Sequence, residues 1–176
     1  MGHLDGLCAV GLDPELWKWT IASVLSRDAM QRYVQTAIDW QTAGTALPYA
    51  TLLRTENRVI GCTRFANIDT IHRRAEIGWT FVAKPWQRTA ANTEAKYLMF
   101  RHGFEAMDCL RVELKTDVLN QQSRKAILRI GAKEEGVLRS HQITETGRVR
   151  DSVYYSVIAS EWPGVKAVLE QRLATS

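Results

Sequence analysis

The sequence predicts one α+β domain, and three features of the chain predict it. Its 176 residues are 45% hydrophobic and 24% charged, a composition that supports a buried core and excludes a disordered chain. Apolar residues recur at helical spacing over residues 1–43, whereas several segments after Pro48 alternate between apolar and polar residues. No linker or low-complexity tract interrupts the sequence, so residues 1–176 are expected to form a single domain.

Two helices are expected in the first part of the chain. Asp13 followed by Pro14 is typical of a helix start, because an Asp side chain accepts from free amides and Pro fits the first helical position. Ser26 or Asp28 would cap a second helix, which reaches about Ala43 and is stopped by the glycine that follows.

Six strands and three more helices are expected after Pro48. The strands are predicted over residues 49–54, 58–65, 76–82, 111–118, 133–140 and 151–159, and the helices over residues 91–107, 120–130 and 162–174. Short connections make the first three strands an antiparallel meander. Alternation within the third strand places Ile77, Trp79 and Phe81 on one face and Glu76 on the other.

Composition excludes several classes of protein. The net charge of +4 is mild, and no basic stripe interleaved with aromatic residues is present, so direct nucleic-acid binding is not expected. No apolar run approaches the ~20 residues that span a bilayer, and the first residues lack a signal peptide, so we expect a cytoplasmic protein without a membrane contact. Cys8, Cys62 and Cys109 lack metal-ligand spacing, so no metal is expected and the thiols act as small apolar residues.

The segment that joins the third strand to the next helix carries the first functional signal. Over residues 84–93, small and polar side chains lead directly into a helix N-terminus, where free amides and the helix dipole suit a phosphate group. An ordinary strand-to-helix turn is the alternative interpretation.

Four stretches of the sequence together resemble one known family. They are residues 75–79 (AEIGW), 86–96 (WQRTAANTEAK), 111–117 (RVELKTD) and 120–123 (NQQS). These stretches, and the order of the expected elements, resemble the RimJ/RimL-type branch of the GNAT acetyltransferases. The resemblance implies a three-layer fold with a mixed, mostly antiparallel sheet, in which the strands over 76–82 and 111–118 are parallel neighbours that splay apart.

The resemblance also implies an activity. It is the transfer of acetyl from acetyl-CoA to a primary amine by direct attack in a ternary complex, with a protein or peptide N-terminal α-amine as the acceptor. A small amine, such as an aminoglycoside or a polyamine, remains open as the acceptor. A catalytically silent acyl-CoA-binding module on the same fold is a further alternative.

The coenzyme residues are expected from the same resemblance. Family members hold the coenzyme pyrophosphate with a Gln/Arg-x-x-Gly-x-Gly/Ala loop, which Gln87, Ala90 and Asn92 match here. Ala90 stands where Gly is usual, so a left-handed backbone at that position would be strained, whereas a right-handed helical or nest conformation accepts Ala. The pantetheine would pair with the third strand near its end, and the thioester would point to the helix that begins after Asn120. The full expected set is Phe81, Val82, Gln87, Arg88, Thr89, Ala90, Ala91, Asn92, Asn120 and Ser123.

Two residues are expected to act in catalysis. An acceptor amine is mostly protonated at neutral pH, so a base is needed, and Glu76 lies at the start of a strand that borders the expected cleft. Its alternative role is an ion pair with Arg73 or Arg74. The resemblance suggests that Ser123 supplies a proton to the coenzyme sulfur; a capping hydroxyl is the alternative.

Three further features carry weaker expectations. His141 is a second candidate base, because an imidazole titrates near neutral pH. The tryptophans of the leading segment are expected in the core or on the wall of the acceptor site. The resemblance implies a further strand before the leading segment, and the sequence as given starts too late to include it. The expectation for one sheet edge therefore stays open, and with it part of the acceptor site and a contact with a second copy of the chain.

Overall fold

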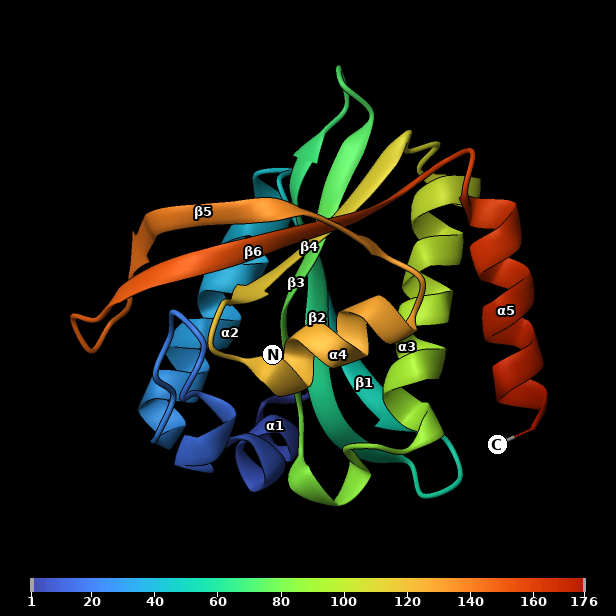
Figure 1. Ribbon diagram of the computed structural model, residues 1–176. Coiled ribbons are helices and arrows are strands. Elements are labelled where there is room, and N and C mark those ends of the chain that lie inside the picture. Colours follow the sequence, from blue (N-terminus) through green and yellow to red (C-terminus); the bar gives the residue numbers. More distant parts are fainter. Residues whose placement is uncertain (1, 176) are drawn as a thin grey trace.

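The computed structural model describes residues 2–175 and contains one six-stranded mixed sheet in the order β1-β2-β3-β4-β6-β5 (Figure 1). The strands are β1 (Leu47–Leu53), β2 (Arg58–Asp69), β3 (Arg74–Val82), β4 (Arg111–Asp117), β5 (Lys133–Ile143) and β6 (Val149–Ile158). The helices are α1 (Leu4–Gly11), α2 (Arg27–Thr42), α3 (Ala90–Arg101), α4 (Gln121–Arg129) and α5 (Trp162–Ala174). The predicted fold class and the antiparallel β1-β2-β3 meander are therefore confirmed. Within residues 2–175, no helix has the length and apolar character needed to cross a membrane.

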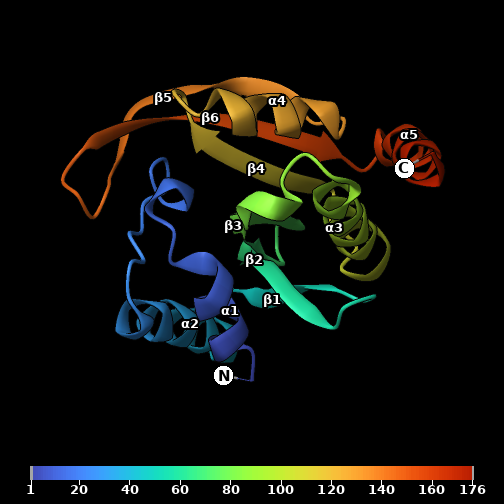
Figure 2. The ribbon, with the colours of Figure 1, turned by 90° about the horizontal axis from the view of Figure 1, so that it is seen from below.

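Two hydrophobic clusters hold the helices against the sheet. The larger cluster joins Met99 of α3, Ile127 of α4 and Leu169 of α5 to strand residues such as Phe65 and Val112. The smaller cluster packs α1 and α2 against the other face of β2 and β3. Figure 2 shows this division, with α3 and α5 side by side and well away from α1 and α2.

The parallel strands β3 and β4 pair over only three residues. Arg74, Ala75 and Glu76 lie opposite Arg111, Val112 and Glu113, and no pairing between the two strands follows. Both strands continue beyond this point, so they diverge (Figure 2). This confirms the expected splay.

A β-bulge in β3 corrects the expected alternation of its side chains. Between the pairs Cys62–Phe81 and Arg64–Gly78, β3 contains one more residue than β2, and Trp79 adopts a left-handed φ of 49°. An extra residue exchanges the faces of all side chains that follow. Ile77 therefore belongs to the larger cluster and Phe81 to the smaller one, so the prediction that they share a face is wrong.

The leading segment also differs from the prediction. Asp13 accepts from the Glu15 amide, but it caps only a single 3₁₀ turn, Pro14–Leu16, and the first helix is α1, which lies before it. The irregular chain after this turn is held by hydrogen bonds outside any helix. Glu145 of the β5–β6 turn donates its amide to the Ile21 carbonyl at 2.9 Å and accepts from the Ser23 amide at 2.7 Å. This segment therefore bridges from α1 to the β5–β6 hairpin.

The helix expected over residues 91–107 is observed in two parts. α3 ends at Arg101, and a π-helical turn, His102–Ala106, completes the segment. The helices expected over 120–130 and 162–174 match α4 and α5.

The contact between β2 and β3 predicts an unequal response to one substitution at two glycines. A Cβ at Gly61 would overlap the Phe81 carbonyl oxygen, whereas a Cβ at Gly164 in α5 would meet no atom within 4 Å. Gly61→Ala is therefore expected to lower the free energy of unfolding by about 3 kcal/mol. Gly164→Ala is expected to change it by less than about 1 kcal/mol. Urea denaturation measures both values, and equal effects would contradict the close approach at Gly61.

Candidate active site

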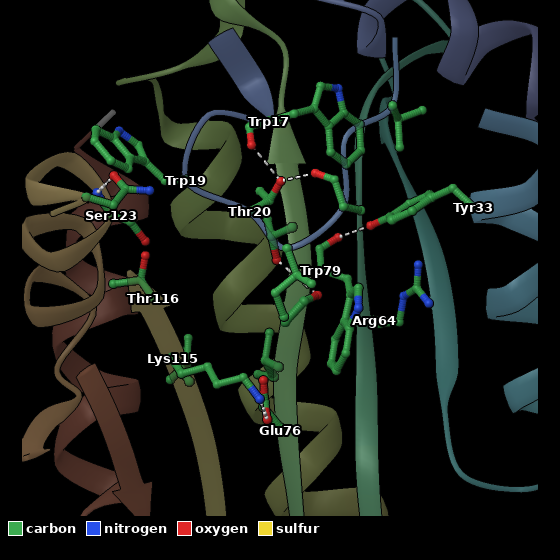
Figure 3. Close-up of a pocket in the computed structure, with 18 of the residues that line it drawn as sticks. Trp17, Trp19, Thr20, Tyr33, Arg64, Glu76, Trp79, Lys115, Thr116 and Ser123 are labelled. Atoms are coloured by element: carbon green, nitrogen blue, oxygen red, sulfur yellow. Dashed lines mark hydrogen bonds and ion pairs between the residues drawn. The ribbon is translucent and has the colours of Figure 1, made fainter. Parts of the chain in front are cut away.

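A cavity of about 700 Å³ lies where β3 and β4 diverge. Its wall combines the segment after the 3₁₀ turn, one side of α2, the bulged part of β3, α4 and the β5–β6 hairpin. Figure 3 shows side chains of the segment after the 3₁₀ turn, α2, β3 and α4 pointing into one space. The diverging strands thus bring together residues that are far apart in the sequence.

Glu76 lies on this wall as the last residue of β3 that pairs with β4. Its side chain is buried, and Oε2 accepts hydrogen bonds from Lys115 Nζ and Asn67 Nδ2, both at 2.9 Å. The alternative pairing with Arg73 or Arg74 is wrong, because these arginines form ion pairs with other carboxylates. Lys115 and Asn67 instead fix one oxygen of the Glu76 carboxylate.

The second oxygen of Glu76 lies over Gly78. Within residues 2–175, Oε1 makes no hydrogen bond, and a Cβ at Gly78 would be only 3.0 Å from it. The absence of a side chain at Gly78 therefore leaves room beside Oε1. The carboxylate is held through one oxygen and open through the other.

The N-terminus of α4 supplies the other predicted catalytic residue. Asn120 caps the helix as expected, because its Oδ1 accepts from the Ser123 amide at 3.0 Å. Ser123 lines the cavity, and its Oγ has no hydrogen-bond partner in the described part of the chain. The capping function therefore belongs to Asn120, and the Ser123 hydroxyl is available to a ligand.

The N-terminus of α3 places Ala90 in a right-handed helix, which is the conformation that accepts alanine at this position. Thr89 Oγ1 accepts from the Ala91 amide at 3.3 Å, and Ala90 is the first residue of the helix. The left-handed residue is Arg88, with a φ of 63°. Alanine thus fits this loop, and the exposed Arg88 side chain lies next to the helix N-terminus.

The other predicted coenzyme residues are dispersed around the cavity. Asn92 lines it together with Asn120 and Ser123. Gln87 connects β3 to α4, because it donates to the Val82 carbonyl at 2.8 Å and accepts from Gln122 at 3.0 Å. The Phe81 side chain is buried beneath α1 and α2, and the stretch of β3 on the cavity wall is residues 76–80. The part of β3 that lines the cavity therefore precedes Phe81 and Val82, the residues expected to pair with the pantetheine.

Sequence reasoning missed a buried lysine on the cavity wall. Lys96 of α3 donates from Nζ to Thr80 at 2.9 Å and to Thr63 at 3.2 Å, and no carboxylate within residues 2–175 pairs with it. Burial lowers the pKa of Lys96 from 10.5 to about 7. Its position three residues before the buried Met99 places it on the apolar side of α3, which is the signal that could have revealed it.

The remaining candidates lie around this site. Of two neighbouring tyrosines of β6, Tyr155 is fully buried, whereas the ring of Tyr154 lies 5.5 Å from Lys115 Nζ, as expected for side chains that alternate between the two faces of a strand. His141 contacts the Tyr154 ring, and burial followed by the nearby positive charges lowers the pKa of its imidazole. Trp17 is buried in the smaller cluster, and its ring also borders the cavity.

Comparison with known proteins identifies the family. The family model described as an acetyltransferase (GNAT) domain matches residues 2–133. The chain belongs to the GNAT acetyltransferase family.

Similar proteins agree with this assignment. The uncharacterized N-acetyltransferase p20 of Bacillus licheniformis is 28% identical over 161 residues, which are 91% of this chain and 89% of that protein. YdaF of Bacillus subtilis (strain 168), whose name assigns it provisionally to ribosomal N-acetylation, is 33% identical over 63% of this chain and 60% of its own length. A GCN5-related N-acetyltransferase from Brucella melitensis superposes with a TM-score of 0.89 and 27% identity, covering 98% of this chain and 78% of that one.

The low pKa of Lys96 predicts a pH dependence of stability in this GNAT domain. The folded protein loses the Lys96 proton near pH 7, whereas the unfolded chain keeps it to a pKa of about 10.4. The unfolded state then binds more protons, so the free energy of unfolding should rise with pH by up to about 1.4 kcal/mol per unit. The Cys62 pKa of about 11, raised by burial, acts in the opposite direction only above about pH 9.

Denaturation of the Lys96→Met variant between about pH 7 and 9 checks this prediction. The variant should lose the slope, while Lys125→Met, a change at an exposed lysine of α4, should keep it. The same slope in wild type and Lys96→Met would contradict a neutral Lys96.

Proposed function

We propose that the protein is an N-acetyltransferase that moves acetyl from acetyl-CoA to a primary amine, the α-amine of a protein or peptide. The observation that carries this proposal is the open Oε1 of the buried Glu76 carboxylate, beside Gly78 in the cavity between the diverging strands. A carboxylate held through one oxygen accepts a proton through the other without moving.

Acetyl-CoA would occupy the gap between β3 and β4. The first-turn amides of α3, with Arg88 beside them, would hold the pyrophosphate, because a helix N-terminus concentrates free N–H groups and positive potential. The edge of β3 that no longer pairs with β4 offers backbone groups to the pantetheine, as it would to an added strand. The thioester would then lie near Ser123, whose hydroxyl is not used elsewhere in the described chain.

Transfer would proceed by direct attack. An amine with a pKa near ~8 to 10 is mostly protonated at neutral pH, so Glu76 Oε1 accepts one proton before the attack. The bond between the amine nitrogen and the acetyl carbon forms as the bond between that carbon and sulfur breaks. The second proton of the amine nitrogen passes to the Ser123 hydroxyl as this hydroxyl gives its own proton to the CoA sulfur. The products are the amide and CoA, and Glu76 releases its proton to water.

The aromatic lining of the acceptor side supports a peptide α-amine as the acceptor. Trp19 and Trp40 lie on the wall, where their rings can pack along a peptide chain. Residues 21–23 and Glu145, which are joined by two hydrogen bonds, also line the cavity. The name of the relative YdaF, which refers to ribosomal N-acetylation, supports the same class of acceptor.

Glu76→Gln tests the base. We expect acetyl transfer at pH 7, measured as thiol release with a panel of peptides, to fall by about 10²-fold or more. Affinity for acetyl-CoA should stay unchanged in calorimetric titration, because Gln keeps an acceptor for Lys115 and Asn67. Glu15→Gln, at an exposed carboxylate, is the matched control. Full activity of Glu76→Gln would exclude Glu76 as the base.

Ala91→Glu tests the coenzyme site. A carboxylate in the first turn of α3 favours the helix dipole, so thermal stability should be kept or raised, yet it repels a pyrophosphate. We expect the dissociation constant of Ala91→Glu for acetyl-CoA, measured by calorimetry, to rise at least tenfold. The neutral Ala91→Gln variant should keep most of the affinity. Equal affinity of the two variants for acetyl-CoA would show that the pyrophosphate binds elsewhere. If acetyl-CoA does not bind to the wild type, the proposed function is overturned.

A further inference from the structure

Arg64 of β2 is a buried cation that the proposed reaction does not use. Its exposed fraction is 3%, and no carboxylate within residues 2–175 lies within ion-pair distance of it. Three aromatic rings surround its guanidinium carbon, at 4.8 Å for Tyr33, 5.3 Å for Trp40 and 5.4 Å for Trp79. Figure 3 shows the guanidinium beside the Trp79 ring in the cavity wall.

Aromatic rings satisfy only part of what a buried guanidinium requires. Ring faces attract the positive charge, but an arginine also carries five N–H donors in a planar fork that matches a carboxylate. Arginine does not escape burial by losing its proton. A ligand carboxylate reaching the cavity wall would therefore meet a desolvated cation without a competing protein carboxylate.

The position of Arg64 relates it directly to Glu76. Arg64 pairs with Gly78, and Glu76 lies two residues before Gly78 on the same face of the sheet, so their backbone positions are offset by about 7 Å along the strands. The Trp79 ring lies beside both sites, because its centroid is 5.4 Å from the Arg64 guanidinium and 5.6 Å from Lys115 Nζ, which holds Glu76. One ring thus spans the proposed base and the unpaired cation.

The charge around the acceptor side favours an anion. Arg32 of α2 also lines the cavity, and it too has no carboxylate partner in the described chain. The carboxylates on the wall are already engaged, since Glu76 accepts from Lys115 and Glu145 accepts from the Ser23 amide. The coenzyme phosphates would lie at the N-terminus of α3, and α3 packs on the opposite face of β2 from Arg64.

We propose that Arg64 binds a carboxylate of the acceptor, and that the preferred acceptor is a peptide whose N-terminal residue is followed by Asp or Glu. This rests on the proposed acetyl transfer to an α-amine near Glu76. The backbone positions of the two residues are offset by about 7 Å, which is similar to the reach from an α-amine to the side-chain carboxylate of the next residue. A free α-amino acid carries both groups on one carbon and does not reach both sites.

Matched peptides test the proposal on the intact protein. Ala-Asp-Ala-Ala-amide is expected to exceed Ala-Asn-Ala-Ala-amide by at least tenfold in kcat/KM for CoA release. Arg64→Gln should remove this difference by lowering only the value for the acidic peptide, with acetyl-CoA affinity unchanged. Arg64→Lys should keep a smaller preference, because an ammonium binds a carboxylate without the planar fork. Arg54→Gln, at an arginine that follows β1, is the control.

A second readout separates this proposal from the proposed function. Calorimetric binding of both peptides to CoA-saturated protein requires no catalysis, and the Asp peptide should bind at least tenfold more tightly to the wild type but not to Arg64→Gln. If neither peptide is acetylated but the Asp peptide still binds more tightly, the proposed acetyl transfer is overturned and the carboxylate site at Arg64 is supported. Equal binding of the two peptides to the wild type overturns the Arg64 site.

A further pair of compounds distinguishes a peptide from a small amino acid as the source of the carboxylate. 5-Aminopentanoate and 5-aminopentanamide place an amine at a similar reach from a carboxylate or a neutral amide. A preference for 5-aminopentanoate without a preference for the Asp peptide would overturn the peptide assignment. Arg64→Gln that lowers kcat/KM equally for both peptides, with a reduced thermal midpoint, would assign Arg64 a purely structural role and also overturn the proposal.

Discussion

Parallel pairing between β3 and β4 ends at Glu76 and Glu113, and the arrangement of the site depends on this end point. Where the backbone ladder stops, Lys115 of β4 reaches across to Glu76 of β3 at 2.9 Å and links the diverging strands. A buried ion pair recovers little net stability, because desolvation of both charges opposes their attraction. The ion pair lies where the two strands begin to diverge, so it holds one end of the gap between them while the rest stays open to a ligand.

The bulge at Trp79 is the second constraint, and it acts on both faces of the sheet. Before it, Ile77 packs into the larger cluster; after it, Thr80 takes that side and accepts from Lys96. The left-handed residue itself places the Trp79 ring next to Arg64, while its carbonyl accepts from Tyr33 at 3.0 Å. One inserted residue thus distributes the polar groups of β3 between the acceptor side and the α3 side.

Local signals in the sequence were sufficient for the elements, but not for the contacts between them. The Asn120 cap, the six strands and the turn into α3 follow from neighbouring residues, and the structure has them. The bulge was missed because strand alternation assumes an unbroken period of two. The partner of Glu76 was missed because Lys115 is 39 residues away, whereas the expected arginines are adjacent. The roles of Glu76 and Ser123 stay predictions, since position in a cavity is not a measured function.

Four cations with little exposed surface lie on the same cavity wall, and they meet the cost of burial in different ways. The Nε atom of Arg150 lies 3.9 Å from the Asp117 carboxylate. Lys115 has a carboxylate, Glu76, at 2.9 Å. Lys96 donates to the hydroxyl groups of Thr63 and Thr80, and its pKa of about 7 means that it loses its proton near neutral pH. Arg64 has neither route, because guanidinium keeps its proton and its neighbours are aromatic rings. Of the four, only Arg64 therefore keeps its charge without a carboxylate partner in the described chain, which is why acceptor selection is assigned to it and not to Arg150 or the lysines.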